Sequence, residues 1–536
     1  MTIAKLALDQ AGRVVVIDDQ LGTSTGAPFI AAQAYDSTYR ALWVDTGAVN
    51  AADGFNNGLR FTTAGALRIY DATAVLPATV NTHLGMAMTT DGQVCVTSGA
   101  STSPYVLNGV AMTNDGRVYV DILAFALEFA DLGAGVVSTV EAIGNATPTF
   151  TRATAATTVL STGLIGAVAS GDPRSYYDPT SLTYLGYLAE GARTNLCLQS
   201  ESLDVDGAGA PWTNTRATVS ADATTAPDGA ATADKLVEDS TAASSHFITQ
   251  AETYANAIHT LSVFAKAGER TWTRLVMFDG TTTRSGFFNL STGAVGTLTN
   301  TTGAVTAYPN GWYRLSITST VALANAAGDF AIYLAEGDND ITFSGDGASG
   351  AYFWGVQLEA GAFASTYIPT TTLAVARNAD VLTYPTTGWL SATAGTIYAQ
   401  YLQFIVSTGS TRQVFVIDDG TNNETIRATQ IATDGTSESF LVLDGGATSA
   451  NVTSPAITAD TTYRKAAAYT ANDFISARNG VLSLNDTSGT LPTVTTASVG
   501  GLSAGGGSFN GPIRRVEYYA NRMPNAVLQA LTNGSR

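Results

Sequence analysis

Alternation of apolar and polar residues along short segments is the pattern that most restricts what this chain can fold into. In residues 352–359 it would place Tyr352, Trp354, Val356 and Leu358 on one face of an extended strand. A spacing of two residues is typical of a β-strand with one buried face, whereas a helix repeats about every 3.6 residues. The pattern therefore predicts β-strands that turn one face toward a core.

A second segment, WYRLSIT at residues 312–318, carries the same pattern and would turn Tyr313, Leu315 and Ile317 toward the core. Composition agrees, because only 13% of the 536 residues are charged and the small and polar residues Thr, Ala, Ser and Gly dominate. Threonine and valine favour strands, glycine favours turns, and long helices need more Glu, Lys and Leu. We predict an all-β chain, with N-terminal β-hairpin repeats followed by two β-sandwiches.

Short glycine-centred repeats occupy residues 1–122, and each has two alternating runs on either side of a glycine. The glycines are Gly12, Gly65, Gly92 and Gly116. A glycine there supplies the positive φ of a tight turn, so each repeat is predicted to be one β-hairpin. So short a hairpin cannot bury its apolar face alone. Either neighbouring repeats stack, or identical hairpins of a trimer pack around a symmetry axis, or the region is an ordinary small β-domain.

Two segments suggest helices. Residues 122–147 are apolar without a clear period, and we expect a short helix there within a buried connector. At the C-terminal end, Pro524 stands where the first turn of a terminal helix would begin. The residues expected to anchor that helix are Met523, Val527, Leu528 and Leu531.

Charge, cysteines and apolar runs exclude several classes of protein. The net charge of −18 disfavours a nucleic-acid partner, because phosphate contacts need basic residues. Cys95 and Cys197 lie far apart, so neither a disulfide framework nor a cysteine-built zinc site is expected. The first residues lack the apolar core of a secretory signal, and no run of about 18 apolar residues occurs. We therefore expect synthesis in a cytoplasm and no membrane span.

Three segments resemble a known group of proteins. They are residues 150–157 (FTRATAAT), 172–196 (DPRSYYDPTSLTYLGYLAEGARTNL) and 354–371 (WGVQLEAGAFASTYIPTT). The first two resemble the opening, and the third the close, of a module shared by many bacteriophage virion proteins. The resemblance implies a carbohydrate-binding-module-like jelly roll over residues 184–376, preceded by a connector and opening segment over residues 123–183.

The last part of the chain carries a second resemblance. Residues 509–532, FNGPIRRVEYYANRMPNAVLQALT, are similar to the closing strand and short helix of laminin-G-like or concanavalin A-like jelly rolls. Residues 377–536 are therefore interpreted as a second jelly-roll β-sandwich of this lectin-like type.

Together the resemblances imply a structural virion protein of a bacteriophage, either a tail fibre or a receptor-binding protein that contacts host surface glycans. Residues 1–122 would attach it to other virion proteins or form a homotrimer. A capsid-attached head fibre or decoration protein is the alternative. A polysaccharide depolymerase spike is a further possibility, because the paired carboxylates of glycoside hydrolysis leave no spacing signature.

Two W-x-R triplets are candidate carbohydrate-binding residues. Trp272 and Arg274 form one triplet, and Trp312 and Arg314 form the other. On neighbouring or stacked strands they would share a face on which rings stack on sugars and guanidinium groups bind hydroxyls. Alternatively, each arginine packs over its own tryptophan or pairs with a carboxylate across the sheet.

The acidic loop at residues 337–347 is a candidate calcium site, with Asp338, Asp340 and Asp346 as oxygen ligands. Its spacing fits no EF-hand, and acidic loops at sandwich corners are usually solvated turns. No other cofactor is expected.

The remaining polar motifs do not indicate catalysis. The histidines are His83, His246 and His259, and none lies in a metal-ligand or nucleophile motif, so no catalytic residue is predicted. Glu190 and Arg193, in the motif EGARTNL, are predicted to tie the opening strand of the first sandwich to its edge and not to touch a ligand.

Overall fold

The structure, a computed structural model, describes residues 123–139, 147–205, 209–405 and 410–534, together with the backbone of ten short strands before them. The chain divides into two units, Met1–Gly109 and Val110–Arg536. Regular structure in the described ranges is almost entirely β, as predicted. No helix within those ranges is long and apolar enough to cross a membrane.

The N-terminal strands form antiparallel pairs, and four of the five pairs lie on either side of a predicted turn glycine, β3 with β4 being the exception. In the first unit β1 pairs with β2, β3 with β4, β5 with β6 and β7 with β8, and in the second unit β9 pairs with β10. Their bounds are Lys5–Leu8, Val14–Ile17, Gln33–Tyr35, Leu42–Val44, Gly58–Phe61, Leu67–Tyr70, Leu84–Met88, Val94–Ser98, Val110–Met112 and Val118–Val120. The predicted hairpins are confirmed as backbone pairings. The side chains of Cys95 and His83 are not among those that the structure describes.

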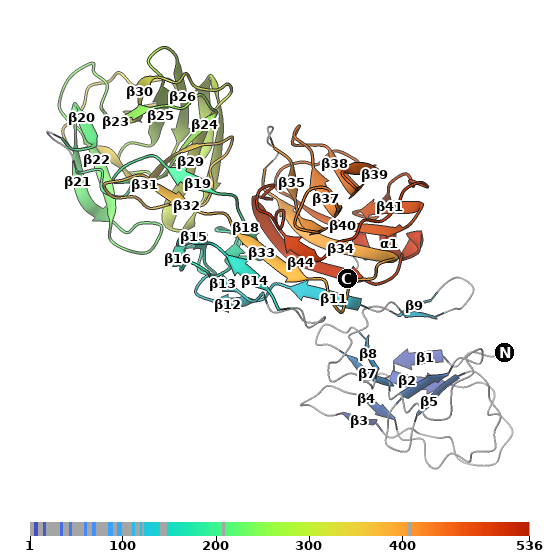
Figure 1. Cartoon of the computed structure of the whole chain (residues 1–536). Helices are drawn as coiled ribbons and strands as arrows, with labels where there is room; N and C mark the ends of the chain where they lie inside the picture. The colour runs from blue at the N-terminus through green and yellow to red at the C-terminus, as the bar shows by residue number, and fades with distance from the viewer. Residues whose placement is uncertain are drawn as a thin grey trace, which may run out of the picture. The chain divides into compact units, whose positions relative to one another are not determined.

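Two six-stranded antiparallel sheets form one β-sandwich, here called the inserted sandwich (Figure 1). Sheet A has the order β20 (Trp212–Thr215), β23 (Phe247–Thr253), β30 (Ala327–Ala335), β25 (Trp272–Phe278), β26 (Thr283–Asn289) and β27 (Ala294–Thr299). Sheet B has the order β21 (Ala217–Thr224), β22 (Ala233–Glu238), β31 (Gly350–Ala360), β24 (His259–Lys266), β29 (Trp312–Ser319) and β28 (Thr301–Ala307). Fully buried side chains such as Leu275, Ile332, Val263 and Leu315 fill the space between the sheets.

Two eight-stranded sheets form the other sandwich, here called the flanking sandwich. Sheet C contains β17 (Ser175–Tyr177), β18 (Tyr184–Ala189), β44 (Gly511–Tyr519), β34 (Ala394–Gln403), β40 (Thr461–Thr470), β41 (Asp473–Arg478) and β42 (Val481–Leu482), with β11 (Leu123–Glu128) paired to β44. Sheet D contains β14 (Thr149–Thr151), β33 (Val381–Pro385), β43 (Thr496–Val499), β36 (Phe415–Asp418), β37 (Thr425–Ile431), β38 (Glu438–Asp444) and β39 (Ala447–Ser454), with β35 (Arg412–Gln413) paired to β37. Its core includes Ile397, Phe415, Phe440 and Tyr518.

The flanking sandwich is discontinuous in sequence, because the inserted sandwich lies between its first strands and its remainder. β11 and β18 both pair with β44, and β14 pairs with β33. Phe125, Leu127 and Tyr187 from these early strands lie in the flanking core. The chain therefore leaves the flanking sandwich after β18 and returns to it at β33.

This arrangement corrects two expectations. The helix expected within residues 122–147 is wrong where the structure describes that segment, because β11 occupies its first part as a strand. A short apolar run is equally compatible with a doubly buried strand. The connector assigned to residues 123–183 and the start of the first sandwich at Tyr184 also change, since β11, β14, β17 and β18 belong to the flanking sandwich. Periodicity identifies a strand without identifying its partner.

A β-bulge in β31 corrects a third expectation. The register with β24 shifts at this point, and Gly355 adopts a φ of 63°. Phe353 and Val356 therefore both face the core between the sheets, whereas Trp354 faces the opposite side. Simple alternation had placed Trp354 and Val356 together, because one extra residue in a strand reverses the facing of all that follows.

The predicted C-terminal helix is present as α1 (Asn525–Thr532), which begins directly after Pro524. Leu528 and Leu531 are buried in it, as is the preceding Met523. The core positions predicted for β29 are confirmed for Leu315 and Ile317, and Tyr313 packs at the margin of the same core.

Candidate functional site

The two W-x-R triplets lie on different sheets of the inserted sandwich. Trp272 and Arg274 belong to β25 in sheet A, and Trp312 and Arg314 belong to β29 in sheet B. In both strands the alternate residues fill the core, so the triplets project from the two opposite outer faces. The prediction that all four side chains share one face is therefore wrong.

Each arginine nevertheless has similar surroundings. Arg274 Nη2 donates to Ser285 Oγ at 3.0 Å, and Arg314 Nη2 donates to Ser262 Oγ at 3.1 Å. Each guanidinium also lies 5.4 Å from a phenylalanine ring, that of Phe287 for Arg274 and that of Phe264 for Arg314. The arginines pack over neighbouring aromatic rings and not over their own tryptophans.

The tryptophan of the triplet on sheet B is covered. Trp312 is only 1% exposed, and its Nε1 donates to the carbonyl oxygen of Thr225 at 3.1 Å. It packs in a second core with Phe264, Trp354 and Tyr367, to which the hairpin of β15 (Ala156–Val159) and β16 (Ile165–Val168) contributes. Trp312 is therefore a structural residue and cannot reach a ligand.

On the outer face of sheet A, Phe247, Tyr333 and Arg274 remain partly exposed, whereas Phe287 is only 4% exposed. A directly paired row crosses four strands there, and we call Phe247, Tyr333, Arg274 and Phe287 the aromatic row. The Phe247 and Tyr333 rings stack with centroids 4.3 Å apart and planes inclined by 18°. The guanidinium of Arg274 lies 5.6 Å from the Tyr333 ring centroid, opposite the contact with Phe287. The face thus presents the partly exposed rings of Phe247 and Tyr333 and one cation, with the buried Phe287 ring packed against that cation.

Trp272 extends the aromatic row along β25. Its ring lies over Gly296, where a methyl group would come within 2.9 Å of Trp272 Cζ3. Glycine at this position therefore leaves room for both the indole and the Asp338 carboxylate. Trp272 is partly exposed, in contrast to Trp312.

Small side chains separate the aromatic row from a second set of larger ones. Ala331, Val276 and Ser285 pair directly in the intervening row. Beyond them Asp329 pairs with Phe278, and burial raises the pKa of the Asp329 carboxyl. The face therefore has a cationic end at Arg274 and an acidic end at Asp329.

Among the described residues Arg274, like Arg314, lacks the ion pairs that other arginines of the inserted sandwich form. Arg270 pairs with Glu238 and Glu336, and Arg284 pairs with Asp279. Arg274 forms no ion pair with a carboxylate of the described residues, and burial lowers its pKa. Its Nε is buried without a hydrogen-bond partner. The guanidinium is thus held by ring faces and one hydroxyl, with hydrogen-bonding capacity left over.

The candidate calcium residues are not brought together. Asp338 accepts hydrogen bonds from Thr297 N at 2.7 Å and Thr297 Oγ1 at 3.0 Å, and Asp346 accepts them from the backbone of Ala348 and Ser349. No group of three or more His, Cys, Asp or Glu side chains among the residues with described side chains could hold a metal ion. The described structure therefore does not gather the predicted set of Asp338, Asp340 and Asp346, since Asp338 binds Thr297 on β27 and Asp346 serves its own turn.

The two histidines with described side chains are buried. His246 Nδ1 lies 2.6 Å from the carbonyl oxygen of Arg216, and His259 Nδ1 lies 3.0 Å from that of Ala257. Both residues are 0% exposed, so neither presents a base to a substrate.

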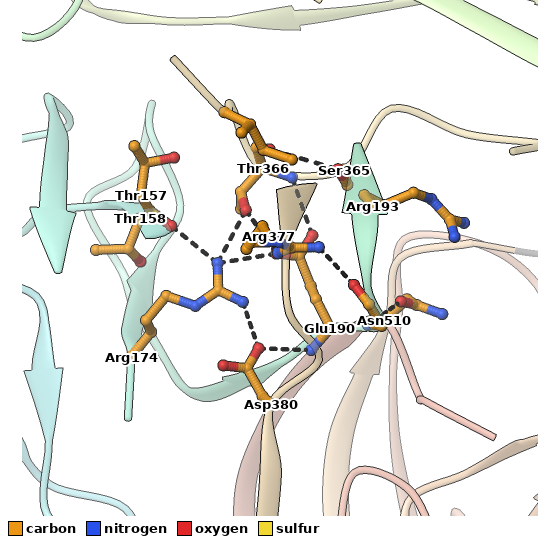
Figure 2. Close-up of polar contacts among 12 residues, drawn as sticks. Thr157, Thr158, Arg174, Glu190, Arg193, Ser365, Thr366, Arg377, Asp380 and Asn510 are labelled. Carbon is orange, nitrogen blue, oxygen red and sulfur yellow. Dashed lines mark hydrogen bonds and ion pairs between the residues drawn. The ribbon is translucent and has the colours of Figure 1, made fainter. Parts of the chain in front are cut away.

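A buried ion network joins the two sandwiches where the chain crosses between them (Figure 2). Glu190 pairs with Arg174 at 2.9 Å and also with Arg377. Asp380 pairs with Arg174 and, at 2.8 Å, with Arg152. Although burial alone would raise the pKa of Glu190, the charges of Arg377 and Arg174 outweigh it and lower that pKa strongly. The structural role predicted for Glu190 is confirmed.

Arg193 has the edge role predicted for it. Its Nε lies 3.4 Å from Glu359 Oε2, and its guanidinium lies 4.7 Å from the Phe363 ring. Asn195 holds the same region by donating to the carbonyl oxygens of Val356 and Ile368. The motif EGARTNL therefore builds the crossing between sandwiches.

Sequence reasoning found Trp272 and Arg274 but missed Phe247, Tyr333, Phe287 and Asp329. These residues stand on strands far apart in the chain, and only the pairing of β23, β30, β25 and β26 aligns them. The one signal available in the sequence was an aromatic residue at a non-core position of a strand. The same signal occurs where another segment of the chain covers the outer face of the sheet.

No family model and no curated protein matches the chain. Among solved structures it is similar to the CBM40 module of a Ruminococcus gnavus IT-sialidase bound to α2,3-sialyllactose, with 16% identity, a TM-score of 0.24, and coverage of 26% of this chain and 84% of that one. Domain 4 of a GH43 extracellular arabinanase from Geobacillus stearothermophilus, in complex with arabinotriose, has 14% identity, a TM-score of 0.21, and coverage of 32% and 82%. Domains LG4-5 of the mouse laminin α1 chain have 10% identity, a TM-score of 0.19, and coverage of 49% and 82%. Such low TM-scores assign no family to this chain.

Proposed function

We propose that this chain is a glycan-binding protein whose binding surface is the outer face of sheet A. The observation that carries the proposal is the aromatic row, in which the partly exposed Phe247 and Tyr333 rings stack beside Arg274 and the buried Phe287 packs on its other side. Aromatic rings bind the apolar faces of sugar rings, and a guanidinium donates hydrogen bonds to their oxygens. Trp272 enlarges the same surface.

The biological setting is proposed from sequence. The resemblance of residues 150–196 and 354–371 to bacteriophage virion modules supports a virion appendage, either a tail fibre or a receptor-binding protein. In that setting the N-terminal hairpins would attach to other virion proteins and form a homotrimer. A head fibre or decoration protein on the capsid is the alternative, and immunogold labelling of particles separates the two positions.

The proposal assigns binding and no catalysis to the chain. The buried positions of His246 and His259 support it, because neither ring can act on a substrate. Incubation with host polysaccharide should yield no new reducing ends, and their appearance would instead identify a depolymerase.

The direct test is binding of the purified protein to host-surface polysaccharide, measured by calorimetry. Tyr333→Ala should weaken binding while the protein stays folded. Glycan binding that is unaffected by changes in the aromatic row would refute this surface as the site.

A further inference from the structure

Arg274 has hydrogen-bonding capacity that the protein itself does not use. Of its guanidinium nitrogens, Nη2 donates to Ser285 Oγ at 3.0 Å. Nη1 forms no hydrogen bond with a described residue, and unlike Nε it is not enclosed. The free edge of the guanidinium therefore faces the exposed side of the sheet.

Arg274 has no carboxylate counter-ion among the described residues, as is also the case for Arg314 on sheet B, whereas two neighbouring arginines have one. Arg284, on the adjacent strand, turns toward the core and pairs with Asp279 at 2.9 Å. Arg270, just before β25, is held between Glu238 and Glu336. In a chain with a net charge of −18, a partly buried cation without a carboxylate partner points to a ligand that supplies one.

We infer that the ligand of this face carries a carboxylate, as in a uronic acid or a nonulosonic acid residue, and that Arg274 is the group that binds it. The inference rests on the proposed glycan-binding function and names the class of sugar. A planar carboxylate suits the planar donor set of a guanidinium, and such charge-assisted hydrogen bonds are stronger than those to a neutral hydroxyl. Tyr333 and Phe287 hold the guanidinium plane in place from both sides.

Asp329 makes one end of this face acidic, whereas Arg274 makes the other end cationic. Asp329 stands four residues before Tyr333 on β30, which corresponds to about 13 Å along a strand. Its carboxylate forms no hydrogen bond or ion pair with a described residue, so it can accept hydroxyl groups and repels a second acid. The ligand should therefore place its acidic sugar at Arg274 and a neutral sugar near Asp329.

The experiment uses the full chain and an array of acidic and neutral oligosaccharides, followed by calorimetry. The soluble probes are a hyaluronan hexasaccharide, in which acidic and neutral sugars alternate, its carboxyl-reduced derivative, and tetragalacturonate. We expect binding to acidic glycans only, and loss of binding on carboxyl reduction. Arg274→Gln should weaken binding of the hyaluronan probe roughly 10- to 100-fold, and Arg274→Lys should retain part of it.

Arg314→Gln is the matched control, because Arg314 has the same kind of serine and phenylalanine contacts on the outer face of sheet B, where Trp312 is buried. It should leave the affinity for the hyaluronan probe unchanged even if stability falls. Asp329→Asn should strengthen binding of tetragalacturonate and leave the hyaluronan probe unaffected.

Each failure has a separate meaning. Equal binding of neutral and acidic glycans, with Tyr333→Ala still disruptive, overturns the inference about the carboxylate and leaves the proposed function standing. Unchanged binding of acidic glycans by Arg274→Gln also overturns it. If no glycan on the array binds, both the inference and the proposed function fall.

Discussion

Trp312 donates its indole N–H to the carbonyl oxygen of Thr225 at 3.1 Å, which fixes the ring within the junction between the sandwiches. Trp272 belongs to the same W-x-R pattern but remains partly exposed on sheet A. Although the two tryptophans have the same sequence context, replacing Trp312 should affect stability and replacing Trp272 should affect glycan binding.

Trp312→Ala should lower the free energy of unfolding by about 3 to 5 kcal/mol, because it removes a fully buried ring and leaves a cavity. Trp272→Ala should change it by less than about 1 kcal/mol and instead weaken glycan binding. Urea unfolding and calorimetry on the two variants check this pair of outcomes. A large loss of stability in Trp272→Ala would show that its ring is structural as well.

Tyr333→Ala should weaken glycan binding about fivefold or more, since a stacking contact contributes on the order of 1 kcal/mol. Tyr333→Phe keeps the ring beside Arg274 and Phe247 and should retain most of the affinity. If both variants bind equally poorly, the Tyr333 hydroxyl and not the ring makes the main contact.

Glu190→Gln should lower the free energy of unfolding by about 3 to 5 kcal/mol near pH 7, because Arg174 and Arg377 lose a buried partner. The folded-state pKa of Glu190 lies below its ordinary value of 4.5. Its contribution is therefore complete above that pH and declines as the pH falls below it.

The measurement is urea unfolding of wild type and Glu190→Gln between pH 7 and pH 3. The difference between the two proteins should shrink below about pH 4.5. A difference that stays constant over this range would show that the carboxylate charge is not what stabilises the junction.

Gly355→Ala should destabilise the protein by about 1 to 3 kcal/mol, because φ is 63° and an added Cβ would lie 3.1 Å from Phe264 Cδ2. Gly388→Ala is a suitable control, since Gly388 also has positive φ but has no atom within 4 Å of the added Cβ. Thermal unfolding of both variants is the measurement. Gly388→Ala reports the cost of backbone strain alone, and the additional loss in Gly355→Ala reports the cost of crowding. Equal losses would mean that the rings at the bulge move aside at little cost.

A fragment of residues 377–536 should not fold by itself, although sequence resemblance marks it as one domain. It lacks β11, β14, β17 and β18, and with them the core side chains Phe125, Leu127 and Tyr187. Each such side chain contributes about 1.5 to 3 kcal/mol, so the loss approaches the whole stability of a domain. A fragment of residues 123–536 should unfold cooperatively in circular dichroism. Cooperative unfolding of the shorter fragment would contradict the discontinuous fold.

Local features of the chain were predictable from the sequence, because they depend on neighbouring residues. Alternation and turn glycines identified the N-terminal hairpins and β29, and Pro524 marked the start of α1. The crossing role of Glu190 was inferred from its position between two patterns. The bulge at Gly355 was missed, because alternation contains no sign of an extra residue in a strand.

Strand pairing was decided only by the tertiary structure. The sequence by itself determined an all-β chain with aromatic residues and arginines at non-core positions, since side-chain direction follows from the local period of the backbone. It could not determine that β11 and β18 both pair with β44, or that Trp312 is covered while Trp272 is partly exposed. Those outcomes depend on contacts between segments hundreds of residues apart, such as Arg174 with Asp380, and no local pattern encodes which edge a strand will join.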